Sequence, residues 1–443
     1  MQGKRFFPGA RPGKKVYLLS LGCPKNLTDS ERLLNRLRAC GHSEAASPEE
    51  ADTLIVNTCG FIEDAKRESV EEILRLAELK KSSGKELLVF GCLSQRYGAE
   101  MRKELPEVDA FWGVDSEDAI AAHIGTPENK EIKTGPALPS TFPYAYLKIA
   151  EGCKRRCSFC SIPAIRGPLR SFAPDALLRQ AEDYIRAGTK ELILVSQDTT
   201  SYNVKGYGLA SLLRDLAAIG GDFRIRVHYF YPAGVDERLL DAMASVDKVA
   251  KYVDMPLQHS EERILRLMAR GGGAAGEKLA GRIRRAIPGV AIRTAFIVGF
   301  PGETEDEFRR LLDFVEEQQF ERMGAFIYSK EDGTAAARLR GHLPREIKQR
   351  RYDELMTAQS VISLEKNKAL VGRTFRVLID ETEGDAATGR LPSQSPGIDG
   401  VITVGNRKGK SRGNKKPKKI AAGDFVLVRV TGASEYDLEG VPA

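Results

Sequence analysis

Three cysteines within eight residues constrain this chain more than any other feature of its sequence. Cys153, Cys157 and Cys160 form a C-x3-C-x2-C run. Ferredoxin-type sites supply four cysteine thiolates to a cubane iron–sulfur cluster. Three thiolates hold only three irons, so one iron stays open for a ligand other than protein, as a position stays open at catalytic metals. The run therefore predicts a reactive [4Fe–4S] cluster, and the plain alternative is three small buried residues.

Composition predicts a soluble protein of several domains. The chain has 443 residues, 42% of them apolar, which is enough for roughly two to four domains. No apolar run approaches the ~18 residues of a membrane span, and the basic N-terminus lacks the apolar segment of a secretory signal. We therefore expect a cytoplasmic protein with no membrane partner, whose seven cysteines serve thiolate chemistry in a reducing compartment.

The positive charge of the chain is concentrated in one segment. The net charge is +7, and residues 407–419 alone contain eight Lys or Arg residues and no acid. Without these eight cations the rest of the chain carries a net charge of −1. The segment is interpreted either as a solvated charge run or as a loop that contacts nucleic-acid phosphates in a salt-sensitive way.

The first domain is predicted over residues 15–125 as a Rossmann-like parallel α/β fold. Apolar runs at 16–21, 53–57 and 87–90 alternate with helical patterns at 29–38 and 62–79. Such alternation is typical of a doubly wound parallel sheet.

A second set of cysteines accompanies these predicted strands. Cys23, Cys59 and Cys92 each stand one or two residues beyond a strand, where the carboxyl ends of parallel strands form a ligand crevice. Glycines that allow close backbone approach stand beside them: Gly22, Gly60 and Gly91. The positions predict a second three-thiolate cluster, whereas a structural zinc site would want four closed ligands. Buried core cysteines are the alternative for any one of them, and Cys40 is interpreted as structural.

Residues 144–365 are predicted to form a partial TIM barrel of six β/α units, after a Pro/Gly/Thr-rich linker at 126–143. The six strand-like runs lie at 144–150, 191–196, 223–230, 252–255, 291–298 and 323–328, short of the eight units of a complete barrel. Residues 370–438 change to β-branched and alternating runs at 374–380, 400–404 and 424–430. They predict a small all-β, OB-like barrel.

The cysteine run at the end of a first barrel strand resembles the radical S-adenosylmethionine (SAM) superfamily. In that family the open iron chelates SAM, and reduction releases a 5′-deoxyadenosyl radical. The resemblance implies that Cys153, Cys157 and Cys160 are catalytic and that Phe159 lies against the adenine. It also implies that Gly299, Gly302 and Glu303 bind the cofactor, although this segment alone reads as a turn with a capping acid.

Together the three predicted domains resemble the radical SAM methylthiotransferases over nearly the whole chain, with the β-module similar to a TRAM domain. The resemblance implies two [4Fe–4S] clusters, a second SAM as methyl donor, and partners that supply electrons and sulfur. Segments at 57–63, 196–202, 254–259, 390–396 and 398–401 resemble the branch that modifies an aspartate β-carbon of protein uS12 of the small ribosomal subunit.

Two alternatives stay open from the sequence. One is the branch that modifies a tRNA adenosine, which RNA contact through residues 407–419 would favour. The other is a non-enzymatic iron–sulfur electron carrier or RNA-binding scaffold, against which the count of three cysteines argues. His259, a candidate polar contact, is more often a structural histidine.

Overall fold

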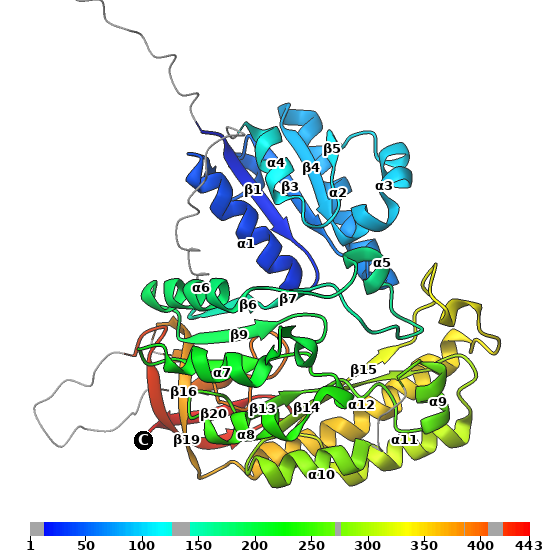
Figure 1. Cartoon of the computed structure of the whole chain (residues 1–443), viewed down its shortest axis with the longest axis vertical. Coiled ribbons are helices and arrows are strands. Elements are labelled where there is room, and N and C mark those ends of the chain that lie inside the picture. Colours follow the sequence, from blue (N-terminus) through cyan, green and yellow to red (C-terminus); the bar gives the residue numbers. More distant parts are fainter. Residues whose placement is uncertain (1–12, 126–141, 271–275, 385, 406–419) are drawn as a thin grey trace, which may run out of the picture. The chain divides into compact units, whose positions relative to one another are not determined.

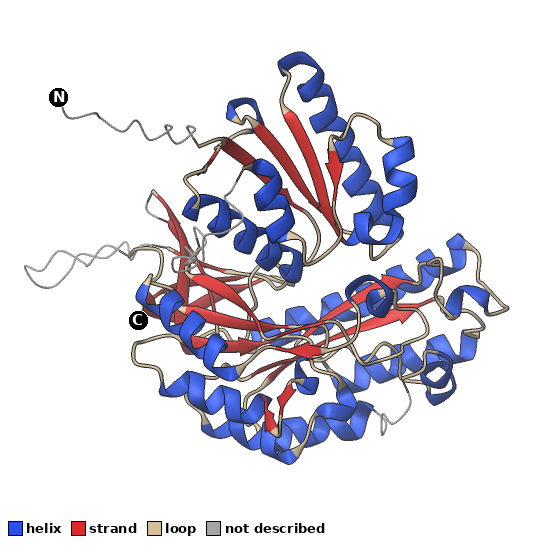
Figure 2. Ribbon diagram, turned by 45° about the horizontal axis from the view of Figure 1, so that its top comes forward, coloured by secondary structure: helices blue, strands red, loops and turns tan. Residues whose placement is uncertain are grey.

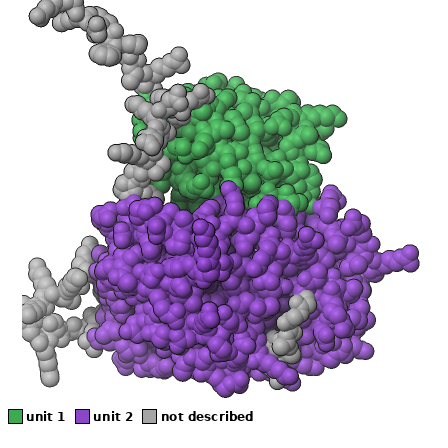
Figure 3. All heavy atoms as spheres, viewed as in Figure 1, with its two compact units in different colours: residues 1–138, 164–166 green, residues 139–163, 167–443 purple. Residues whose placement is uncertain are grey.

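The structure is a computed structural model that describes residues 13–125, 142–270, 276–384, 386–405 and 420–443. The chain divides into two compact units (Figure 3). Unit 1 contains Met1–Leu138 and Ala164–Arg166, and unit 2 contains Pro139–Pro163 and Gly167–Ala443. Most of the predicted linker and all of the basic insert at 407–419 lie outside the described residues.

Unit 1 contains a parallel five-stranded sheet, which confirms the predicted α/β class. The strand order is β2-β1-β3-β4-β5, and every pairing is parallel. The strands are β1 Lys15–Ser20, β2 Ser43–Glu44, β3 Thr53–Thr58, β4 Glu86–Gly91 and β5 Ala110–Phe111. The three central strands match the predicted runs to within about a residue, while the two-residue edge strands carry too short a pattern to be predicted.

Helices cover both faces of this sheet (Figures 1 and 2). They are α1 Pro24–Ala39, α2 Glu63–Ser83, α3 Cys92–Glu104 and α4 Glu117–Ile124. Successive strand side chains point to opposite faces: Leu54 packs with α2 and α3, whereas Ile55 packs with α1 and α4. Helix α1 begins five residues before the predicted 29–38, because Pro24 at its first position is suited to a helix start.

Six parallel strands of unit 2 form the predicted partial barrel. They are β6 Tyr144–Lys148, β9 Glu191–Val195, β12 Arg224–Val227, β13 Tyr252–Asp254, β14 Ala291–Val298 and β15 Arg322–Ile327. They pair in the orders β12-β9-β6 and β13-β14-β15. The halves are joined where the Phe230 N–H donates to the Asp254 carbonyl over 2.8 Å. Only β12 is clearly shorter than its predicted run of 223–230.

Helices follow the barrel strands, and two-residue strands lie in the loops. The helices are α5 Ile162–Arg166, α6 Pro174–Arg186, α7 Leu209–Ala218, α8 Glu237–Ser245, α9 Glu262–Leu267, α10 Gly276–Ala286, α11 Glu305–Gln318 and α12 Arg345–Lys368. The short strands are β7 Ala150–Glu151, β8 Arg170–Ser171, β10 Asn203–Val204 and β11 Tyr207–Gly208. Thr304 and Glu307 form a capping box at the start of α11, which satisfies free backbone N–H groups there.

The end of the chain forms a closed five-stranded β-barrel, as predicted. Its strands are β16 Thr374–Glu383, β17 Ala386–Arg390, β18 Ile402–Val404, β19 Phe425–Ala433 and β20 Leu438–Pro442, in the order β16-β17-β18-β20-β19. Strands β17 and β20 were not predicted, because Ala, Gly, Pro and Glu are poor strand formers. This β-barrel belongs to unit 2 together with the partial barrel.

Within the described ranges, no helix is both long enough and apolar enough to cross a membrane.

Candidate metal centres

The C-x3-C-x2-C run lies in a loop after β6 that hydrogen bonds hold at several points. The Cys153 N–H donates to the Gly167 carbonyl over 3.1 Å, and the Cys160 N–H donates to the Cys157 carbonyl over 3.1 Å. Between them, the Ser158 N–H donates to the Met268 carbonyl over 2.9 Å. The loop is therefore held to the rest of the unit at Cys153 and Ser158, and it turns between Cys157 and Cys160.

A glycine and a buried ion pair fix the entry into this loop. Gly152 has φ +72°, and a Cβ there would lie 2.1 Å from the Pro168 oxygen, so only glycine fits. The buried Glu151 carboxylate accepts from the Gly152 N–H and from Gln197 Nε2, each over 3.0 Å. It also pairs with buried Lys148. Because a buried carboxylate needs such partners, Glu151 restricts the loop to one path.

The three thiols of this loop lie near one another. Burial, with a smaller contribution from the neighbouring Cys157 and Cys153 thiols, raises the pKa of Cys160 to about 12. Burial also raises the pKa of Cys153, to which Cys157 contributes. In the metal-free chain Cys153 and Cys160 are thus neutral thiols at neutral pH, and iron would displace their protons on binding.

Two arginines enclose a tyrosine ring beside these cysteines, an arrangement that the sequence did not indicate. The guanidinium carbons of Arg155 and Arg270 lie 3.8 and 4.5 Å from the centroid of the Tyr231 ring. Arg155 Nε is 2.8 Å from Asp198 Oδ2, and Arg270 Nη1 donates to Cys157 Sγ over 3.7 Å. These side chains give the site a positive character, although they are far apart in sequence.

The predicted SAM-binding residues lie close to one another in unit 2. Phe159 packs in a cluster with Phe300 and Tyr328, and Phe300 stands between Gly299 and Gly302. Gly299 has φ +72°, so the turn after β14 depends on it. The fold thus brings the aromatic residue of the cysteine loop beside the glycine-rich turn.

Glu303 is already engaged within the chain. Its Oε2 accepts from the Phe300 N–H, and its Oε1 accepts from Arg351 Nη1, each over 2.9 Å. Burial raises the pKa of this carboxyl, and the Arg351 charge partly offsets the effect. These contacts shape the glycine-rich turn, and a role for Glu303 in cofactor binding stays a prediction.

The second cysteine set lies at the carboxyl ends of neighbouring strands of unit 1. Cys23 precedes α1 as its N-cap, Cys59 follows β3 directly, and Cys92 is the first residue of α3, directly after β4. Because β1, β3 and β4 are adjacent and parallel, their carboxyl ends meet at one edge of the sheet.

Electrostatic effects indicate that these three thiols also lie near one another. Burial, with smaller contributions from Cys92 and Cys23, raises the pKa of Cys59 to about 11. Burial likewise raises the pKa of Cys92, which Arg166 partly offsets. For Cys23 burial acts in the same direction, but the Lys25 and Arg166 charges, together with the backbone N–H groups of Lys25 and Asn26, outweigh it and lower the pKa.

Glycines at this edge make room for the cysteine loops. Gly22 has φ +87°, and a Cβ there would lie 2.7 Å from the Cβ and 2.9 Å from the Sγ of Cys59. A Cβ at Gly60 would lie 2.8 Å from the Leu93 backbone. The close packing of backbone against Cys59 and Leu93 therefore requires glycine at both positions.

The three thiols of Cys23, Cys59 and Cys92 fit an iron–sulfur cluster better than a single metal ion. No group of three or more His, Cys, Asp or Glu side chains within the described ranges could hold one metal ion. A cubane cluster differs, because each thiolate binds a separate iron and the sulfurs need not meet at one point. Three neighbouring thiols, next to glycines that the close backbone packing requires, suit such a cluster.

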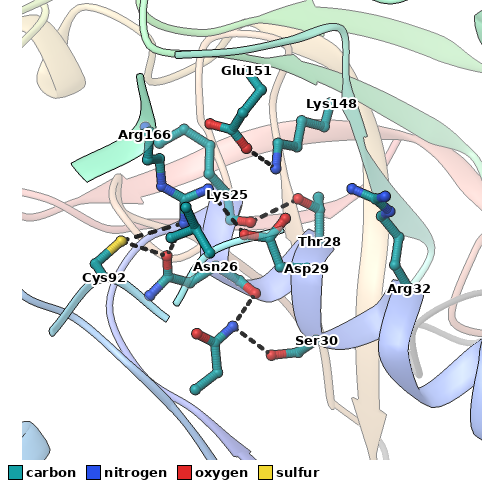
Figure 4. A network of polar contacts seen from close by, with 12 residues as sticks. Lys25, Asn26, Thr28, Asp29, Ser30, Arg32, Cys92, Lys148, Glu151 and Arg166 are labelled. Carbon is teal, nitrogen blue, oxygen red and sulfur yellow. Dashed lines mark hydrogen bonds and ion pairs between the residues drawn. The ribbon is translucent and has the colours of Figure 1, made fainter. Parts of the chain in front are cut away.

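Arg166 and Asn26, which the sequence reasoning missed, contact the second set (Figure 4). Arg166 Nη2 donates to Cys92 Sγ over 3.3 Å and to Asn26 Oδ1 over 2.6 Å. Asn26 Nδ2 donates to the carbonyls of Leu21 and Thr58 over 2.9 and 3.0 Å. The position of Asn26 three residues after Cys23 was the only local signal.

Two other candidates have structural surroundings. Cys40 is the C-cap of α1, and its N–H donates to the Leu37 carbonyl over 3.0 Å. His259 Nδ1 accepts from the Glu261 N–H over 3.0 Å. Burial lowers the pKa of His259 to about 3, so this imidazole is neutral at pH 7.

Comparisons with known families divide the chain into three parts. The family model described as uncharacterized protein family UPF0004 matches residues 15–113, the radical SAM superfamily model matches 147–315, and the TRAM domain model matches 371–442.

Close relatives carry one name. The ribosomal protein uS12 methylthiotransferase RimO of Thermodesulfovibrio yellowstonii is 47% identical over 97% of this chain and 99% of the relative. The RimO of Aquifex aeolicus is 45% identical over 96% of each chain. Among solved structures, the radical SAM methyltransferase TsrM of Kitasatospora setae, with cobalamin and a [4Fe–4S] cluster bound, has a TM-score of 0.53 at 14% identity. It covers 85% of this chain and 80% of its own, a likeness that concerns the fold alone.

Proposed function

The chain belongs to the RimO family of ribosomal protein uS12 methylthiotransferases, and on this premise we propose that it transfers a methylthio group to the β-carbon of an aspartate in uS12. The relatives' name supports this substrate over a tRNA adenosine, and the radical SAM match supports an enzyme over an electron carrier. Its cofactors are SAM and [4Fe–4S] clusters.

The observation that carries the proposal is the presence of two separate sets of three neighbouring cysteines. We assign one cluster to Cys153, Cys157 and Cys160, and the second to the trio that follows β1, β3 and β4: Cys23, Cys59 and Cys92. When bound, the first cluster supplies the electron that cleaves SAM and the second supplies the sulfur that is transferred. A protein that only carries electrons gains nothing from leaving one iron of each cluster open.

The chain's own residues orient and enclose the first site. Glu151 and Gly152 fix the entry to the cysteine loop, and Ser158 anchors its middle to Met268. Phe159 presents an apolar surface beside Phe300, which suits an adenine ring and keeps water from a reactive species. Gly299 and Gly302 shape the adjoining turn, where backbone groups would contact the cofactor.

We further assign roles to the parts of the chain. Residues 15–125 hold the sulfur-supplying cluster, and residues 144–365 bind SAM, with 126–143 as a linker. The TRAM region at 370–438, with the basic insert at 407–419, contacts ribosomal RNA near uS12. A cytoplasmic location follows from a ribosomal substrate. The assignment also requires an electron donor and a sulfur donor.

Reconstitution with SAM, a reductant and sulfide, followed by mass spectrometry of uS12 and tRNA, tests the proposal. We expect the mass of a methylthio group on a uS12 aspartate and none on tRNA. Cys59→Ser should abolish the product. Cys40→Ser, which replaces the one cysteine of the seven that belongs to neither set, should leave product formation unchanged. A methylthio group on tRNA alone, or product formation by Cys59→Ser, would overturn the proposal.

A further inference from the structure

Arg166 is a buried cation that contacts Cys92, one of the predicted cluster ligands. Its side chain is 2% exposed. Nη1 donates to Asp29 Oδ2 over 3.0 Å, and Nη2 donates to Cys92 Sγ over 3.3 Å (Figure 4). A buried guanidinium is stable only with a carboxylate and further acceptors. Here one nitrogen bonds to the carboxylate and the other to the sulfur.

Asn26 connects this arginine to all three cysteine loops of unit 1. Its Oδ1 accepts from Arg166 Nη2 over 2.6 Å and from the Cys92 thiol over 3.5 Å. Its Nδ2 donates to the carbonyl of Leu21, two residues before Cys23, and to that of Thr58, one residue before Cys59. The amide is 0% exposed, so water does not compete for these hydrogen bonds.

We propose that Arg166 is a positioning residue that holds Cys92 both directly and through Asn26 and sets the reduction potential of the cluster bound by Cys23, Cys59 and Cys92. The inference rests on the proposed function, because it takes those three thiolates as the ligands. It concerns a residue that lies six positions after Cys160 in the sequence yet contacts the other cysteine set.

The sign of the effect follows from electrostatics. Reduction adds negative charge to the cluster and its thiolates. An N–H donor and a positive charge beside Cys92 stabilise the reduced form, since hydrogen bonds to the sulfurs help to set the potential. Arg166 therefore raises the potential, and Asp29, whose carboxylate opposes the guanidinium charge, lowers it.

The test measures the potential of this cluster alone. The full-length chain carrying Cys153→Ala, Cys157→Ala and Cys160→Ala is reconstituted with iron and sulfide, its iron is counted, and the cluster is titrated with EPR detection. Arg166→Gln, Arg166→Lys and Asp29→Asn are then compared in this background. The matched control is Arg102→Gln, which removes an arginine of the same unit whose Nη atoms donate to the carbonyls of Gly98 and Phe111.

We expect Arg166→Gln to reduce the equilibrium constant for reduction at least tenfold, a shift of about 59 mV to more negative potential for one electron. Asp29→Asn should shift it to more positive potential, and Arg166→Lys, which keeps the charge, should fall between Arg166→Gln and the parent. Arg102→Gln should not shift it. A merely structural role for Arg166 and Asp29 would not move the two potentials in opposite directions.

The outcomes separate the inference from the proposed function. If Arg166→Gln binds no iron, the reduction potentials of Arg166→Lys and Asp29→Asn still test the inference, because they should shift in opposite directions from the parent. Shifts of one sign in the Arg166 and Asp29 variants, or none beyond that of Arg102→Gln, would overturn the inference while leaving the cluster assignment intact. Absence of iron from the parent, which keeps all three cysteines of unit 1, would overturn the assignment and the inference with it.

Discussion

Arg390 and Glu191 are separated by 199 positions in the sequence, yet they form a buried ion pair in which Nη1 and Oε2 are 2.5 Å apart. Glu191 begins β9 of the partial barrel and Arg390 ends β17 of the β-barrel. Arg226 Nε donates to the other carboxylate oxygen over 2.7 Å. Burial raises the pKa of Glu191, but the charges of Arg226, Arg390 and Arg224 together outweigh it and hold the pKa at about 2.

Replacing this carboxylate should destabilise unit 2 strongly. We expect Glu191→Gln to lower the free energy of unfolding by about 3–5 kcal/mol, because buried Arg226 loses its carboxylate partner and Arg390 keeps only that of Asp380. Urea unfolding at pH 7.5 measures the change. Asp222→Asn is the matched control, since Arg376 and Asp222 also join the two barrels but are 49% and 65% exposed, and such pairs contribute about 1 kcal/mol or less. Equal losses in both variants would contradict this account.

His228 should make the protein less stable in mild acid. Burial lowers its pKa to about 4, and its Nε2 lies 2.8 Å from Ser395 Oγ. Below pH 6.5, the pKa of an unperturbed histidine, His228 binds a proton in the unfolded chain but not in the folded chain. The stability of the folded state therefore falls from pH 6.5 toward pH 4.

By pH 5.5 this histidine alone should remove about 1.4 kcal/mol. His228→Gln, which retains a group able to reach Ser395, should reduce the stability difference between pH 7.5 and pH 5.5 by that amount. Urea midpoints at the two pH values give the comparison, in which any pH-independent effect of the replacement cancels. His259 contributes in the same direction, so part of the pH dependence should persist. An unchanged difference would show that His228 is protonated in the folded chain.

The space at Gly22 should matter more than its backbone conformation. Gly22→Ala places a Cβ against the side chain of Cys59, whereas a Cβ at Gly41, which has a similar φ of +90°, meets no atom within 4 Å. Both replacements carry the cost of a positive φ, about 1 kcal/mol. We expect only Gly22→Ala to lose the iron of the second cluster, roughly half of the total iron. Equal iron content in the two variants would exclude a steric requirement.

Asn26 should be needed to hold the cysteine loops of unit 1. Asn26→Ala leaves buried carbonyls at Leu21 and Thr58 without this donor, at a cost of about 1–3 kcal/mol each. We expect lower stability and loss of iron from this site, measured by urea unfolding and iron analysis after reconstitution. Asn35→Ala on the same helix removes an amide that accepts from Arg38 and should leave the iron content unchanged. Full iron content in Asn26→Ala would contradict the role.

Local patterns in the sequence were sufficient for the classes of fold and for the cysteine sets. Strands such as β3 and β9 are continuous buried runs, and their apolar pattern depends only on neighbouring residues. The expectation that Cys59 and Cys92 share one edge needed only the ends of two parallel strands. The strands β17 and β20 were not predicted, because their residues have a weak intrinsic strand propensity. Pairing with neighbouring strands of the β-barrel outweighs that propensity in the folded chain.

Only the tertiary structure revealed the residues that serve the cysteines. Arg166 contacts Cys92 across 74 positions of sequence, and Arg270 contacts Cys157 across 113. In the sequence, segments 390–396 and 398–401 showed only a family resemblance. In the structure, two residues of the first segment make buried contacts: Arg390 pairs with Glu191, and Ser395 lies against His228. The sequence determined where strands end and thiols stand, because those are local properties. Which charges lie beside the thiols depends on contacts that form only when distant segments pack together.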